Sequence, residues 1–225
     1  ACGGKINKQD VEDCQIGTSY SIPDPIAYFK FDGNLDSTSN PIIKFKKWAS
    51  HPLPTYEDSF AGYKQGAKFT KELKTGARSI EITGFNNEVT IGLWIKFEKG
   101  YIFKKRGIGN SENPGQKGFS LKSRLGQLRW FAGGLGNSDS KCANFNTWKY
   151  VVVTAKMEGD KVIYINGEEC PGSRELTGTK GMESNNKNFY LGPNLGFTGT
   201  LDELKIWNVE LTPEQVKSLY KSNIN

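Results

Sequence analysis

The chain reads FTGTLDELKIWNVELTPEQVKSLY over residues 197–220, and this stretch decides how the rest of the sequence is interpreted. From position 201 it alternates: odd-numbered residues from Leu201 to Trp207 fall on one side, and even-numbered residues from Asp202 to Asn208 fall on the other. Period-two alternation of β-branched and aromatic residues with polar ones is typical of a strand with one buried face. We therefore expect a strand here.

The same stretch then changes its period. Thr212 is a good helix N-cap, Pro213 suits the first helical position, and Gln215 stands where a capping box places Glu or Gln. Apolar residues follow at helical spacing, at positions 216, 219 and 220. The pattern predicts a short terminal helix that lays one apolar stripe on the body of the protein.

A second alternating run lies near the start of the chain. Residues 26–37 read IAYFKFDGNLDS, with Ala27, Phe29 and Phe31 in phase and an Asp-Gly-Asn turn signal behind them. Runs between these two ends also read as strands, the clearest being 89–97 and 148–155. A hairpin is expected from 118–122 to 127–131, and another from 148–155 to 161–168. Some twelve strands, one helix and regular turns predict an all-β antiparallel two-sheet jelly-roll sandwich.

Length and composition favour one large β domain. The chain has 225 residues, with 26 glycines and 12% aromatic residues, and no linker or repeat interrupts residues 26–225. Residues 1–25 hold two cysteines and a Pro-Asp-Pro break, which indicates a disulfide-stapled extension. The net charge is 30 − 24 = +6, spread along the chain. A solvated surface explains this charge, and an acidic glycan or a phosphate-bearing partner is the alternative.

The four cysteines are Cys2, Cys14, Cys142 and Cys170, and they form no metal-binding pattern. An even number of dispersed cysteines fits two disulfides in an oxidising compartment. We favour Cys2–Cys14 and Cys142–Cys170, because each pair closes a short loop. The alternative is a bacterial lipoprotein in which Cys2 carries the lipid. No apolar run approaches the length of a membrane span.

Several stretches resemble, in order, the laminin-G-like branch of the concanavalin A-like lectin/glucanase superfamily. They are YFKFDGN at 28–34, IGLWI at 91–95, WKYVVVT at 148–154, IYING at 163–167 and the closing run at 199–220. Each is a core strand with a turn, so the resemblance covers about residues 26–221 and implies the fold more than the ligand. It also implies that the first and last strands lie side by side, and that Trp94, Trp148 and Trp207 belong to the core.

The resemblance implies a structural calcium ion where those two strands meet. Asp32 and Asp202 stand at the matching positions, and Asn34 lies in the same loop. Carboxylate and amide oxygens are the ligands that Ca²⁺ prefers. The alternative is that the Asp-Gly-Asn run merely forms a turn and that Asp202 accepts hydrogen bonds from it.

Catalysis is not indicated. Hydrolases of this fold carry alternating acidic residues on one strand, and glycosidases need a pair of carboxylates at a defined separation. No such strand is found, and the single histidine, His51, lies between Ser50 and Pro52 without a catalytic signature. A polysaccharide hydrolase or lyase is the least favoured alternative.

Binding is the better hypothesis. Sugar sites combine an aromatic platform with planar polar groups. The candidates are Trp48, Tyr101, Arg124, Arg129 and Trp130, although alternation puts Arg129 and Trp130 on opposite faces of their strand. We expect a secreted or cell-surface, non-enzymatic module that binds a glycan. A protein-binding adhesion or assembly domain is the alternative, and nucleic acid is not an expected partner because the basic residues are dispersed.

Overall fold

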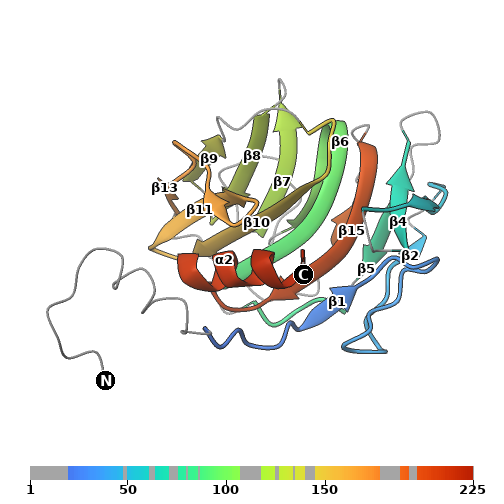
Figure 1. Cartoon of the computed structure of the whole chain (residues 1–225), viewed down its shortest axis with the longest axis horizontal. Coiled ribbons are helices and arrows are strands. Elements are labelled where there is room, and N and C mark those ends of the chain that lie inside the picture. Colours follow the sequence, from blue (N-terminus) through green and yellow to red (C-terminus); the bar gives the residue numbers. More distant parts are fainter. Residues whose placement is uncertain are drawn as a thin grey trace, which may run out of the picture.

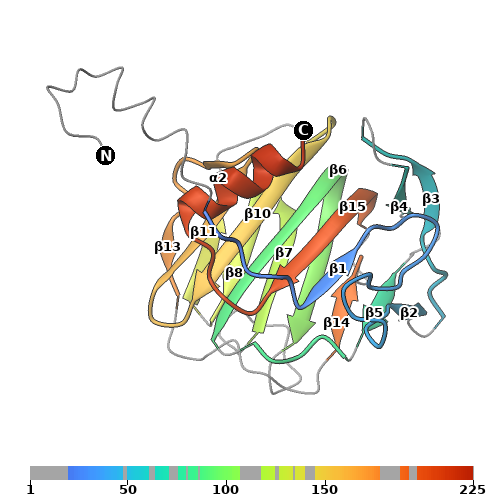
Figure 2. The same cartoon turned by 60° about the horizontal axis from the view of Figure 1, so that its bottom comes forward.

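The protein folds as two stacked antiparallel β-sheets, and the C-terminal helix packs on the outside of one of them (Figures 1 and 2). The computed structural model describes residues 20–47, 50–60, 64–70, 76–79, 81–85, 87–106, 118–124, 127–133, 135–139, 145–177, 188–192 and 197–224, without the side chains of residues 106, 124, 135–139 and 176. The predicted all-β antiparallel sandwich with a short C-terminal helix is therefore confirmed.

Most strands are short, and two of them are long. In chain order the elements are β1 (Ala27–Phe29), β2 (Lys46–Lys47), β3 (Thr55–Asp58), β4 (Gln65–Phe69), β5 (Ala77–Ser79), β6 (Glu88–Arg106), β7 (Gly118–Arg124), β8 (Gln127–Ala132), β9 (Leu135–Asp139), β10 (Lys149–Lys156), β11 (Asp160–Ile165), β12 (Glu168–Glu169), β13 (Glu175–Leu176), β14 (Phe189–Leu191), β15 (Thr198–Trp207) and α2 (Pro213–Ser222).

The long strand β6 belongs to both sheets and is curved along its length (Figure 1). Sheet I runs from β12 and β13 through β11 and β10 to the first half of β6, then to β15, which pairs with β1 and β4. Sheet II runs β9-β8-β7, then the second half of β6, then β14-β5-β2. As the resemblance implied, the first and last strands lie side by side.

The main hydrophobic core fills the space between the two sheets. Sheet I contributes residues such as Phe29, Val89 and Ile206, and sheet II contributes residues such as Phe103 and Phe189. Both hairpins that the sequence predicted are present, as β7–β8 and β10–β11. Period-two burial along each strand is what packs one face of each sheet into this core.

A second, smaller hydrophobic cluster lies between sheet I and α2. The helix begins as predicted: Thr212 and Gln215 form a reciprocal capping box, with Pro213 in the first turn. Its buried stripe, Val216 and Leu219, covers the outer side of sheet I (Figure 2). Sheet I is therefore covered on both sides.

The strict alternation predicted for β15 is wrong at one point. Leu201, Leu204 and Ile206 all lie in the main core, although the pattern put Leu201 on the opposite side from the other two. The register against β6 shifts between Asp202 and Lys205, and Glu203 has a positive φ of 51°. A bulge of this kind inserts an extra residue and changes the phase of the alternation.

The N-terminal segment that the structure describes lies against the end of sheet I. The carbonyl of Pro23 accepts a hydrogen bond from the Trp207 indole at 2.7 Å, and the carbonyl of Ser21 accepts one from Gln215 at 2.8 Å. The domain boundary placed after residue 25 stays a prediction, because residues 1–19 lie outside the described part.

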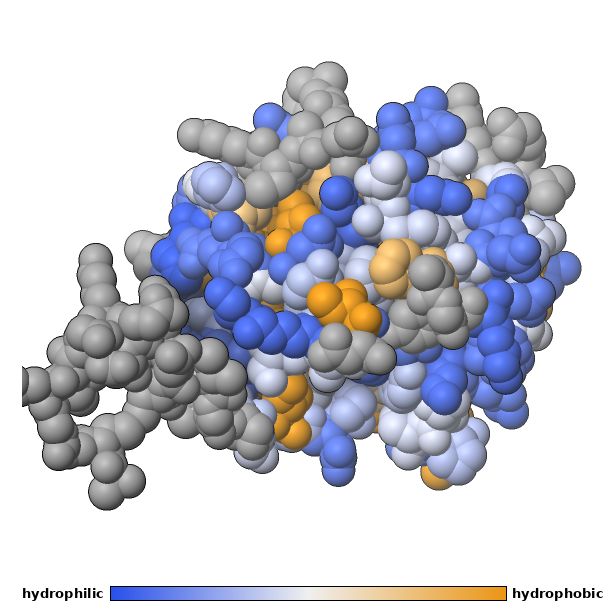
Figure 3. Space-filling model, in the orientation of Figure 1, coloured by the Kyte–Doolittle hydropathy of each residue, from blue (hydrophilic) through white to orange (hydrophobic). Residues whose placement is uncertain are grey.

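The described surface is largely hydrophilic. Figure 3 shows apolar residues only in small patches separated by polar ones on the face in view. The large hydrophobic side chains that are most exposed, Tyr20, Ile42, Leu53 and Ile224, are scattered singly along the chain, which is normal for a folded domain. In the part of the chain that the structure describes, no helix is long and apolar enough to cross a bilayer.

Candidate functional site

The outer face of sheet II carries the candidate site. Along β7 and β8, Leu121, Leu128 and Trp130 point into the main core, so their neighbours Lys122 and Arg129 point outward. The same alternation turns Tyr190 of β14 outward, between Phe189 and Leu191, which are both buried in the core. The side chains of this outward-facing set therefore share one face of the sheet, although Tyr190 is itself buried on that face, with 8% of its surface exposed.

Three outward residues form a row across neighbouring strands. Tyr101 lies opposite Lys122, and Lys122 lies opposite Arg129. The Lys122 Nζ donates to the Tyr101 hydroxyl at 3.3 Å and lies 5.1 Å from the centre of its ring. Side chains directly opposite each other in a sheet interact, so this tyrosine–cation row is one contiguous surface.

A second row runs parallel to the first. Arg78 lies opposite Tyr190, Tyr190 opposite Lys104, and Lys104 opposite Ser120. The Lys104 Nζ lies 5.8 Å from the centre of the Tyr101 ring. This ring therefore has two ammonium groups near it, those of Lys104 and Lys122. The Tyr190 hydroxyl accepts a hydrogen bond from Asn188 at 2.9 Å, which fixes its position.

This arrangement combines aromatic rings with several cations on one side of a rigid sheet. Arg78, Lys104, Lys122 and Arg129 bring four positive charges to the two rows. Arginine and lysine donate charge-assisted hydrogen bonds to carboxylate and sulfate oxygens as well as bonds to hydroxyl groups. Tyrosine rings add apolar contact area with a polar tip.

Of the predicted ligand residues, the structure brings Tyr101 and Arg129 onto one face. Arg124 pairs with Gln127 at the end of the β7–β8 hairpin, but its side chain lies outside the described part, as does Trp48 altogether. Their roles stay predictions.

The prediction that Trp130 contacts a ligand is wrong. Trp130 is fully buried between the sheets and its indole N–H donates to the carbonyl of Thr154 at 2.8 Å. A buried indole needs such a partner, and this one ties sheet II to sheet I. Trp94 and Trp207 are buried as expected, whereas Trp148 is only partly buried, with the Lys96 Nζ 5.5 Å from its ring.

Sequence reasoning missed Arg78, Lys104 and Tyr190 as site residues. Each is the outward residue of its own strand, so alternation alone could have assigned its side. Strand β14 joins this face by pairing with β6, which is far away in sequence, and β5 joins it by pairing with β14. That pairing is not visible in a local pattern.

The predicted calcium residues lie where β15 changes partners. β15 pairs with β4 up to Leu201 and with β1 from Leu204, and Asp202 stands in the gap between the two pairings. Asp202 is fully buried and accepts hydrogen bonds from the Ser59 hydroxyl and from the Glu203 N–H. Asp32 accepts a hydrogen bond from the Gln65 N–H at 3.2 Å.

Asp202 lies in a buried, negatively charged environment. Burial, together with the nearby carboxylates of Glu203 and Asp32, raises the pKa of Asp202 to about 7, against the hydrogen bonds from Ser59 and the Glu203 N–H, which lower it. Asn34 is exposed, and its side-chain oxygen already accepts the Asp36 N–H at 2.9 Å. Within the described residues, no group of three or more acidic, histidine or cysteine side chains is placed to hold a metal ion. The structure therefore brings Asp32 near Asp202 without placing Asn34 beside them, and the calcium site stays a prediction.

One of the four cysteines lies in the described part. Cys170 is buried and disulfide-bonded. Cys2, Cys14 and Cys142 lie outside the described residues, so both proposed pairings, and the lipidation alternative at Cys2, stay predictions.

The fold and this layout agree with a family match. The model of the Laminin_G_3 family, described as the concanavalin A-like lectin/glucanases superfamily, matches residues 70–217, which is more than half of the chain. The chain therefore belongs to this family of β-sandwich domains.

Solved structures with the same fold include binding domains. The binding domain of Paraclostridial Mosquitocidal Protein 1 is 14% identical over 90% of this chain and 53% of its own, with a TM-score of 0.68. Domain 4 of AbnA, an extracellular GH43 arabinanase from Geobacillus stearothermophilus solved with arabinotriose, is 19% identical over 88% of this chain and 98% of its own (0.64). The binding domain of botulinum neurotoxin DC, solved with rat synaptotagmin II, is 13% identical over 88% and 51% (0.65). This chain spans about half the length of these toxin domains, and such distant likenesses establish the fold alone.

Proposed function

We propose that this protein is a non-catalytic carbohydrate-binding module that binds an anionic glycan on the outer face of sheet II. The observation that carries the proposal is the row Tyr101–Lys122–Arg129, which places an aromatic ring beside two cations on a rigid sheet. Uronate or sulfate groups would accept hydrogen bonds from Lys122 and Arg129. The Tyr101 ring would contact the C–H groups of a sugar.

The comparisons support a binding role in general terms. One structural neighbour was solved with arabinotriose and another with a protein, so the family's fold serves both kinds of partner. The glycan is favoured here because the described apolar surface is scattered, whereas the cations of sheet II are gathered. A protein partner is the alternative, and a polysaccharide hydrolase or lyase is the third possibility to be tested.

The test is affinity measurement against matched glycans. Isothermal titration calorimetry would compare polygalacturonate, alginate and heparin with neutral arabinan and dextran, and the same reactions would be checked for released products. We expect binding to the anionic set, weaker at higher salt because surface charges are screened. Replacing Lys122→Ala and Arg129→Ala together should lower the affinity at least ~10-fold.

The matched control is Lys217→Ala on α2, which removes a similar charge on the other side of sheet I. It should leave glycan affinity unchanged. If the control lost half as much binding free energy as the double variant, which removes two charges, total charge alone would drive binding. If no glycan bound, a protein partner would be favoured instead. Release of products would identify an enzyme.

We also propose a structural calcium ion held by Asp32 and Asp202. The support is electrostatic: a fully buried carboxylate, with two further carboxylates near it, stands at the point where β15 passes from β4 to β1. A divalent cation there would neutralise this charge and tie the first and last strands together. Its role would be structural, since the outer face of sheet II is made of other residues.

An extracellular location, secreted or on the cell surface, completes the proposal. The disulfide at Cys170 supports it, because structural disulfides persist mainly in oxidising compartments. The free thiol content of protein purified from its native compartment, measured with and without reductant, would test this point.

A further inference from the structure

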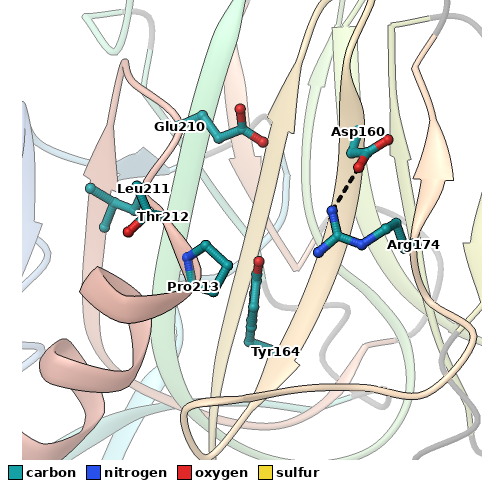
Figure 4. A pocket seen from close by; sticks show the side chains of 7 residues that line it. All are labelled: Asp160, Tyr164, Arg174, Glu210, Leu211, Thr212 and Pro213. Atoms are coloured by element: carbon teal, nitrogen blue, oxygen red, sulfur yellow. Dashed lines mark hydrogen bonds and ion pairs between the residues drawn. The ribbon is translucent and has the colours of Figure 1, made fainter. Parts of the chain in front are cut away.

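A cavity of about 290 Å³ lies on the opposite side of the protein from the outer face of sheet II. It is formed by β11, by Arg174 just before β13, and by the segment that leads into α2 (Figure 4). This volume is at the lower limit for drug-sized ligands, so it suits a molecule of about one sugar ring.

Glu210 supplies an unused acceptor on one side of the cavity. Figure 4 shows its carboxylate extending over the strands, above the hydroxyl of Tyr164. The Glu210 backbone N–H is bound to Glu88, but no described residue donates a hydrogen bond to the Glu210 carboxylate. Burial, and then the charge of Glu88, raises the pKa of Glu210. A ligand that donated to this carboxylate would offset part of that burial cost.

Arg174 supplies donors on the other side. Its Nη1 donates to Asp160 at 2.6 Å, and its Nε and Nη2 donate to the two carboxylate oxygens of Glu169. Arg174 also hydrogen-bonds to the side chain of Tyr164. These bonds fix the plane of the guanidinium, which has five N–H groups in all. The cavity is therefore bordered by a fixed donor and a free acceptor, with the ring of Pro213 adding an apolar surface.

We propose that this cavity binds one neutral sugar ring through a pair of its hydroxyl groups, one donating to Glu210 and one accepting from Arg174. A hydroxyl group can do both, which matches a site that offers an acceptor and a donor. An anion would face Glu210 and Asp160, and an ammonium group could not accept from Arg174. The site is independent of the proposed glycan face, because none of its residues belongs to sheet II.

The experiment is a titration of the ¹⁵N-labelled protein with glucose, galactose, mannose, xylose and arabinose, followed by amide chemical shifts. A ligand of this size is expected to bind with a Kd on the order of millimolar. At least one sugar should shift the amides of Tyr164, Arg174 and Glu210, and Glu210→Ala should weaken it ~10-fold or more. Glu210→Gln should bind with intermediate affinity, because its amide oxygen still accepts.

Glu214→Gln is the control, since it removes one exposed negative charge in the first turn of α2 and should bind like the unaltered protein. Unchanged thermal unfolding of each variant would exclude misfolding. The proposal is overturned if no neutral sugar shifts these amides, if Glu210→Ala binds as well as the unaltered protein, or if methylammonium shifts them and sugars do not. Because Lys122 and Arg129 are intact throughout, failure here leaves the proposed glycan face untouched.

Discussion

Tyr101 and Lys122 lie opposite each other on β6 and β7, and the lysine Nζ lies 5.1 Å from the centre of the tyrosine ring. The same Nζ donates to the tyrosine hydroxyl at 3.3 Å. The Lys122 ammonium group therefore contacts Tyr101 in two ways, by its attraction to the ring and by its hydrogen bond to the hydroxyl. Together these contacts orient an aromatic surface beside a cation. This pair is the centre of the proposed glycan face.

The first prediction separates the ring of Tyr101 from its hydroxyl. Tyr101→Phe keeps the ring and loses the bond to Lys122, so glycan affinity should stay within about 3-fold of the unaltered protein. Tyr101→Ala removes the stacking surface and should cost ~10-fold, which corresponds to about 1.4 kcal/mol, at the upper end for an aromatic contact. Calorimetry with the anionic glycan that binds best would decide. Equal losses in both variants would show that the hydroxyl matters and the ring does not.

The second prediction concerns Trp130, whose indole spans the two sheets. Trp130→Phe leaves the buried carbonyl of Thr154 without its donor and a gap beside it, so the free energy of unfolding should fall by about 1–3 kcal/mol. Chemical denaturation would measure this. Trp148→Phe, at a partly exposed site, should cost less than about 1 kcal/mol. Glycan affinity should not change in the folded Trp130 variant, and a clear loss would return Trp130 to the ligand site.

Local patterns predicted most of this fold, because strands and caps are set by nearby residues. The start of α2, for example, could be predicted from Thr212, Pro213 and Gln215 alone. The bulge at Asp202–Glu203 could not be predicted in this way. It arises because β15 exchanges one neighbouring strand for another, and this depends on β1 and β4, which are more than a hundred residues away.

Only part of the candidate site could be predicted from local sequence patterns. The β7–β8 hairpin placed Arg129 and Trp130 on opposite faces, and this alternation is what removes Trp130 from the site. Which face was outward could not be read from the hairpin, since it depends on where the other sheet packs. Tyr190 and Arg78 entered the site through long-range pairing that no local pattern reveals.

The third prediction concerns pH and Lys105, a buried lysine of β6 whose Nζ lies 5.8 Å from the centre of the Phe85 ring. Burial lowers the pKa of Lys105 to about 8. Between pH 8 and the unfolded value near ~10.5, the folded state binds fewer protons than the unfolded state, so stability should rise with pH in this window. Below pH 8 the full cost of burying the charge remains.

Lys105→Met should therefore raise the free energy of unfolding by about 2–3 kcal/mol at pH 7, and this gain should shrink toward pH 10. Urea denaturation at several pH values would measure it. Lys99→Met, at an exposed position of the same strand, should show no such pH-dependent difference. A gain that stayed constant with pH would mean that packing, and not the buried charge, sets the difference.

The fourth prediction tests the calcium ion. If Asp32 and Asp202 share a cation, calcium at about a hundred times its Kd should stabilise the protein by about 2.7 kcal/mol relative to EDTA, which is a rise of about 5–10 °C in Tm for a chain of this size. Asp202→Asn keeps the shape and the hydrogen bond from Ser59 but loses the charge, so the response to calcium should vanish. The exposed Asp24→Asn should respond as the unaltered protein does. If the unaltered protein melted at the same temperature in calcium and in EDTA, no calcium ion would be held there, and Asp202 would be stabilised by its hydrogen bonds from the Ser59 hydroxyl and the Glu203 backbone N–H.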